Sequence, residues 1–95
     1  MTSATLDVLR DLALATEPTW GLHVIAATGR PAGCVYPILS RLEERGWLTS
    51  AWEDDDRRGP RRRLYALTDA ARPAVRELLA ERETSAPSRL DRALS

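Results

Sequence analysis

Apolar residues recur at intervals of three and four in several segments of this 95-residue chain, which is the spacing that buries one side of an α-helix. The first such segment covers residues 2–16, where Thr2 or Ser3 can cap the amino terminus of the helix. Its apolar stripe consists of Leu6, Leu9, Leu12 and Ala13. We therefore expect the fold to begin with an amphipathic helix.

A second, shorter helix is expected from about Trp20 to Thr28. Pro18 disfavours helical backbone at the residue before it, Thr19 can cap the new helix, and Gly29 would end it. We expect the buried side of this helix to carry Leu22, Ile25 and Ala26.

The clearest helical pattern lies between Pro31 and Gly46. Its apolar positions follow the i, i+3, i+4, i+7 spacing of a single buried face, and they are Val35, Ile38, Leu39 and Leu42. We expect a helix over about residues 32–45, which Gly46 would terminate.

After Gly46 the apolar period changes to two, which indicates β-structure. Residues 46–53 and 61–68 are typical of strands, and a proline-glycine turn region separates them. The two strands should therefore form a hairpin. One side of the second strand would carry Arg63, Tyr65 and Leu67.

A last helix is expected over about residues 68–83, with Thr68 and Asp69 as caps and Pro73 near its first turn. Its apolar side carries Val75, Leu78 and Leu79. The polar, proline-interrupted residues 84–95 predict a mobile tail, so a single domain would span residues 3–83.

This order of three helices, a two-stranded hairpin and a carboxy-terminal helix predicts a mostly α, winged helix-turn-helix fold. The third helix then occupies the recognition position, and the hairpin forms the wing. The order of elements alone leaves the function open, because some winged domains bind DNA and others bind proteins.

The basic and acidic residues balance, with 14 of each and no net charge, and every basic residue is an arginine. Arginine has a planar guanidinium group that suits phosphates and guanine edges. A single cysteine and a single histidine exclude an intrachain disulfide and leave the usual metal sites without ligands. No nucleophile-base pair or catalytic motif is present, so we expect neither an enzyme nor a cofactor. Without a membrane-spanning run or signal peptide, the expected location is the cytoplasm.

The segment EDDDRRGPRRRLY, residues 53–65, places four acidic residues and five arginines at the predicted hairpin tip. One interpretation is a solvated turn whose charges neutralise one another. The other is a wing whose outward arginines contact the DNA backbone or the minor groove. The candidates for such contacts are Arg57, Arg58, Arg61 and Arg62.

The third predicted helix presents polar groups opposite its buried stripe. Tyr36, Ser40 and Arg41 can reach phosphates or base edges, and the amino terminus at Gly33 and Cys34 can offer backbone amides to a phosphate. Simpler alternatives remain: Tyr36 could pack on the preceding helix, and Arg41 could pair with Glu44 or Asp69. Arg45 is better explained by its place near the helix end, where a cation favours the dipole.

Two segments carry a resemblance to a known family. GCVYPILSRLEERGWL, residues 33–48, combines Tyr-Pro with Arg-Leu-Glu and a closing glycine, and GPRRRLYALTDAA, residues 59–71, joins basic residues to Leu-Thr. Both resemble the PadR family of bacterial transcriptional regulators, and weaker similarity extends over about residues 5–82. The resemblance implies a dimeric DNA-binding repressor acting on a two-fold operator. It also implies dimer contacts from the first and last helices, here Leu6, Leu9, Val75, Leu78 and Leu79.

The chain departs from the family pattern at several positions. Cys34 stands where Thr or Ser is usual, and Pro31 or Ala32 replaces a common capping serine. Some family members bind flat hydrophobic compounds between tryptophans of their last helices, but no tryptophan follows Trp52 here. That ligand function is not expected, and any small-molecule effector is unknown. The main alternative is a protein-binding adapter that controls another regulator, which the zero net charge favours slightly.

Overall fold

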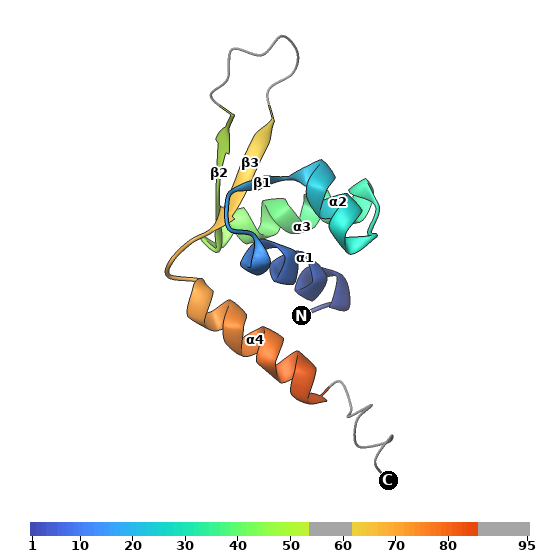
Figure 1. Cartoon of the computed structure of the whole chain (residues 1–95), viewed down its shortest axis with the longest axis vertical. Coiled ribbons are helices and arrows are strands. Elements are labelled where there is room, and N and C mark those ends of the chain that lie inside the picture. The colour runs from blue at the N-terminus through green and yellow to red at the C-terminus, as the bar shows by residue number, and fades with distance from the viewer. Residues whose placement is uncertain (54–61, 86–95) are drawn as a thin grey trace.

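The computed structural model describes residues 1–53 and 62–85, and its elements confirm a winged helix-turn-helix fold. The wing hairpin projects from one side of the helices, and the last helix lies at the opposite end (Figure 1). In chain order the elements are α1 (Ser3–Leu14), β1 (Thr19–Trp20), α2 (Gly21–Thr28), α3 (Ala32–Glu44), β2 (Leu48–Trp52), β3 (Arg63–Leu67) and α4 (Arg72–Ser85).

The core forms where α1, α2, α3 and the sheet meet, and α1 also contacts α4. The predicted stripe of α3 is confirmed, since all of its members are buried: Val35, Ile38, Leu39 and Leu42. From α1 the buried residues are Val8, Leu9 and Leu12, so the buried side is turned slightly from the predicted one and Leu6 is only half-buried. Burying each of these side chains stabilises the fold by about 1.5–3 kcal/mol.

Both glycine stops and the first cap are as predicted. Thr2 caps α1 by accepting a hydrogen bond from the Thr5 amide, at 3.1 Å. Gly29 and Gly46 adopt positive φ angles of 71° and 78°, which close α2 and α3 at little cost because glycine lacks a Cβ.

The two predicted wing strands form the hairpin of β2 and β3, and a third strand that the sequence did not predict joins it. β1 pairs antiparallel with β3, with Thr19 opposite Tyr65 and Trp20 opposite Leu64, which gives the strand order β1-β3-β2. Thr19 is therefore a buried strand residue, and no side chain caps α2. A strand of two residues is too short to show a period of two, and its partner lies far away in the sequence.

The predicted buried face of α2 is correct only for Ile25, which is half-buried against the core. Gly21 and Val24 are buried, whereas Ala26 is exposed and Leu22 keeps 67% of its surface exposed. Nearly every residue of this short helix is small or apolar, so the sequence offers no polar side to define its orientation.

The last helix begins at Arg72, later than predicted, because residues 68–71 form a separate turn. In this turn the Thr68 hydroxyl accepts the amide of Ala71 at 3.2 Å and donates to the Gly46 carbonyl at 3.0 Å. The turn thereby joins β3 to the end of α3. Pro73 occupies the first turn of α4, as expected. Among the described helices, none has the length and apolar character needed to cross a membrane.

Candidate nucleic-acid interface

The side of α3 that faces away from the core is an exposed polar surface. Its exposed residues are Gly33, Tyr36, Pro37, Ser40 and Glu44. Helical spacing places Gly33, Pro37, Ser40 and Glu44 in one row, opposite the buried stripe. From the sequence, Glu44 was considered only as an ion-pair partner of Arg41, although its position four residues after Ser40 indicates that it belongs to this exposed row. A carboxylate there can accept a hydrogen bond from the amino group of cytosine.

Tyr36 lies at the edge of this surface nearest α2 and packs on that helix, which was the simpler of its two predicted roles; its contact with DNA stays a prediction. Its ring contacts Gly21 closely: a Cβ atom added at Gly21 would lie 2.7 Å from the ring Cζ and 2.8 Å from the hydroxyl oxygen. At the same time 42% of the residue is exposed. The ring therefore holds α2 against α3 while part of it faces solvent.

Cys34 lies differently from the other candidates at this end of α3. It is half-buried against the core, and its amide donates to the Pro31 carbonyl at 2.9 Å. That amide is consequently engaged within the protein, and Pro31 provides no side-chain cap. Gly33 is the more exposed of the two predicted residues.

Arg41 and Arg45 lie along the opposite edge of α3, beside the start of α1. Both are exposed, and within residues 1–53 and 62–85 neither forms an ion pair. Asp69, a suggested partner of Arg41, pairs with Arg72 at 3.6 Å instead. The guanidinium groups of both residues are therefore available for other contacts.

A polar network fixes the wing against α3. The Arg63 Nε donates to the Ser50 hydroxyl at 3.0 Å, and the same guanidinium lies 3.4 Å from a carboxylate oxygen of Glu43. Ser50 also donates to the Glu43 carboxylate. Arg63 thus belongs to the support of the wing, a role that the sequence did not reveal because the three residues lie on three different elements.

Arg62 lies on the other face of the sheet and stacks on an aromatic ring. Its guanidinium carbon is 4.5 Å from the centroid of the Trp20 ring, and Trp20 in turn lies 5.6 Å from the ring of His23. Arg62 remains exposed. Stacking restrains the guanidinium plane but leaves its N–H edge open to an acceptor. The other wing candidates, Arg57, Arg58 and Arg61, lie outside the described residues.

An acidic residue on α1 connects α4 to the turn before α3. Asp7 lies 2.8 Å from Arg82 of α4 and 3.0 Å from Arg30 of the α2–α3 turn. Burial acts to raise the pKa of Asp7, but hydrogen bonds and charge interactions with Arg82 and Arg30 together outweigh it and lower the pKa. The carboxylate is therefore held in its charged form between two helices.

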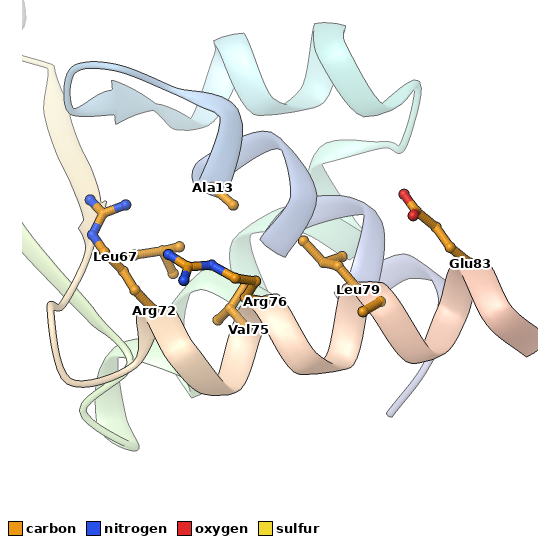
Figure 2. A pocket seen from close by; sticks show the side chains of 8 residues that line it. Ala13, Leu67, Arg72, Val75, Arg76, Leu79 and Glu83 are labelled. Carbon is orange, nitrogen blue, oxygen red and sulfur yellow. The ribbon is translucent and has the colours of Figure 1, made fainter.

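The predicted dimer residues divide into two groups. Leu9 and Val75 are fully buried within the core of the single chain, whereas Leu6, Leu78 and Leu79 are half-buried. Figure 2 shows a groove between α1 and α4 in which Leu79 points toward Ala13, and charged side chains line the rim. An adjoining hollow includes Leu14, which is 70% exposed. The groove and the hollow share Ala13, Leu79 and Glu83, so they form one continuous surface between α1 and α4.

Comparisons with known proteins identify related sequences and folds. A family profile described as "Transcriptional regulator PadR-like family" matches residues 12–77. No curated protein matches the chain. A PadR-like transcription factor of Bacteroides fragilis is 28% identical with a TM-score of 0.65, over 82% of this chain and 80% of that one.

Two further solved structures share the fold at lower identity. A PadR family transcription regulator of Clostridium difficile R20291 is 22% identical with a TM-score of 0.66, over 82% of this chain and 86% of that one. ZitR of Lactococcus lactis, a zinc-responsive MarR family member, is 23% identical with a TM-score of 0.75, over 96% of this chain and 60% of that one.

Proposed function

Because the chain belongs to the PadR-like family of transcriptional regulators, we propose that it is a dimeric repressor that binds DNA in a sequence-specific manner. Regulators of this family are in general not enzymes. The proposed partners are double-stranded DNA and a second copy of the chain, and the proposed location is the cytoplasm, where bacterial DNA lies.

The observation that carries the proposal is the arrangement around α3. Its exposed row of small and polar residues is bordered on one side by Tyr36 and on the other by Arg41, which has no ion-pair partner among the described residues. A helix of this kind fits the major groove, where Ser40 and Glu44 would face base edges and arginine would face phosphates. The amino-terminal end at Gly33 would approach the backbone.

The wing would add contacts beside the major groove. Arg62, held on Trp20, is the described residue that supports this part of the proposal. Arg57, Arg58 and Arg61 belong to the same proposal from the sequence alone. Each phosphate that such arginines neutralise releases counterions and makes binding more sensitive to salt.

A dimer would place two α3 helices on a two-fold operator with half-sites about 34 Å apart. The groove between α1 and α4, together with Leu6, Leu14 and Leu78, supplies the half-buried and exposed apolar surface for this contact. Leu9 and Val75 would support it from within the core.

A mobility-shift assay with the DNA upstream of the gene tests this function. A retarded complex that survives excess unrelated DNA is expected, and its absence at low salt would favour the adapter alternative. That alternative has one supporting observation, the exposed Leu22 and Trp52 on the surface of a chain without net charge.

The zinc response of ZitR is not part of the proposal. In the described part of the chain, no cluster of three or more His, Cys, Asp or Glu side chains could hold a metal ion. Ligand screening that monitors tryptophan fluorescence tests for a small-molecule effector.

A further inference from the structure

A small hollow lies between the start of α1 and the second half of α3. It is lined by the buried Ile38 and Leu42, by Arg41 and Arg45, and by Met1, Thr2 and Thr5 at the start of the chain. It lies on the edge of α3 opposite Tyr36. The hollow is therefore a different site from the proposed wing contact at Trp20 and Arg62, which lies beyond the Tyr36 edge.

The electrostatics of this hollow indicate an anion. Arg41 lies in the last turn of α3 and Arg45 is the cap residue at its end, four positions later. Like charges at this spacing on a helix repel by about 0.2–0.5 kcal/mol. Within the described ranges Arg41 and Arg45 have no carboxylate partner. The same holds for Arg10, Arg62 and Arg76, but only Arg41 and Arg45 line this hollow. An external anion between the two groups would relieve the repulsion.

The hydroxyl groups of Thr2 and Thr5 together provide one further hydrogen-bond donor. The oxygens of Thr2 and Thr5 lie 2.8 Å apart and share one hydrogen bond. One hydroxyl proton lies in that bond, so the other hydroxyl can donate outward. The Thr5 amide is already bonded to the Thr2 oxygen, which fixes the position of the pair. Two guanidinium groups and a hydroxyl donor are the usual groups that bind a phosphate oxygen.

We propose that this hollow binds a backbone phosphate of the DNA strand that flanks α3 on the α1 side. The inference rests on the proposed DNA-binding function. A helix in the major groove lies between two phosphate backbones about 12 Å apart. The wing is placed to contact one of them, and the hollow faces the other. Arg41 then contacts phosphate rather than a base, and Arg45 acquires a binding role beyond its effect on the helix end.

The first test compares the salt dependence of operator binding for wild type, Arg45→Ala, Arg62→Ala and Arg45→Lys. Arg45→Ala should reduce the slope of log K against log salt by about 0.9 for each half-site, and Arg45→Lys should largely preserve it because the charge is kept. Arg45 is exposed, so the variant should fold; circular dichroism checks this. An unchanged slope in Arg45→Ala, with a reduced slope in Arg62→Ala, would overturn the inference while leaving the proposed function intact.

The second test replaces single operator phosphates by uncharged methylphosphonates. In each half-site, replacing one particular phosphate should lower the affinity of wild type and of Arg62→Ala but not that of Arg45→Ala. Replacing a different phosphate should lower the affinity of wild type and of Arg45→Ala but not that of Arg62→Ala. An identical profile for wild type and Arg45→Ala would contradict a DNA phosphate site. If inorganic phosphate shifted the Thr5 amide resonance while the profile stayed unchanged, the hollow would hold a free anion and the assignment to DNA would be wrong. Failure of wild type to bind any DNA specifically would instead refute the proposed function.

Discussion

The ring of Tyr36 occupies the space in which a side chain at Gly21 would lie, with the ring Cζ 2.7 Å from the position of a Cβ atom. This contact joins the first residue of α2 to the exposed edge of α3. It makes the helix-turn-helix geometry depend on a glycine that does not touch the exposed row of α3, and it leads to the first prediction.

Gly21→Ala should displace the Tyr36 ring. Because the added methyl group overlaps the far end of an exposed side chain, we expect the free energy of unfolding to fall by only about 1 kcal/mol. The displaced ring should also change which DNA sequences the protein prefers. Chemical denaturation and selection from a random duplex library measure the two effects. Tyr36→Phe, which keeps the ring, is the control and should retain wild-type stability; unchanged preference in Gly21→Ala would show that the contact does not orient Tyr36.

Trp20→Ala should weaken DNA binding through Arg62. Loss of the stacked ring frees the guanidinium to move, so affinity should fall although Trp20 makes no contact with DNA in the proposal. A double-mutant cycle with Arg62→Ala should give a coupling of about 0.5–1 kcal/mol. Trp20→Phe should retain part of the effect, and additive losses in the double mutant would disprove the coupling.

Asp7→Asn should destabilise the fold by about 1 kcal/mol at neutral pH, because both Arg30 and Arg82 lose their charged partner. The lowered pKa of Asp7 means that its contribution is fully present above the ordinary carboxyl pKa of 3.8 and is lost as the pH falls through the lower folded-state pKa. Urea denaturation across this range measures the difference between variant and wild type.

Asp69→Asn is the matched control for Asp7. Its carboxylate is fully exposed and 3.6 Å from Arg72, so little change in stability is expected at neutral pH. If Asp69→Asn lowered the free energy of unfolding as much as Asp7→Asn does, the ion pair between Asp7 of α1 and Arg82 of α4 would contribute no more than an exposed pair.

Asp11→Asn should have the opposite effect, although Asp11 lies only one helical turn after Asp7. Burial raises the pKa of Asp11, with a smaller opposing effect of His23, and within the described residues its buried Oδ2 atom has no hydrogen-bond partner. Removing the charge should stabilise the fold by roughly 0.5–1 kcal/mol at neutral pH. The gain should shrink as the pH falls from the raised folded-state pKa toward 3.8, where both states become protonated. Thermal unfolding at several pH values checks the sign.

The sequence predicted elements whose signal is local. The apolar stripe of α3, both glycine stops and the two wing strands follow from spacing and turn residues alone. The sequence did not predict elements that depend on a distant partner. β1 exists because β3 offers an open edge, and α2 packs with Gly21 against the ring of Tyr36. The same distinction applies to the candidate interface, since the exposed row of α3 follows from helical period, whereas the stacking of Arg62 on Trp20 required a strand that was not predicted.

The central claim is that α3 and the wing recognise a specific two-fold DNA sequence. The most direct measurement is selection of bound duplexes from a random-sequence library by the full chain at near-physiological salt, followed by sequencing. The account predicts enrichment of one motif with two inverted half-sites whose centres lie about one helical turn, or a multiple of it, apart. Bound duplexes that show no enriched motif would contradict it.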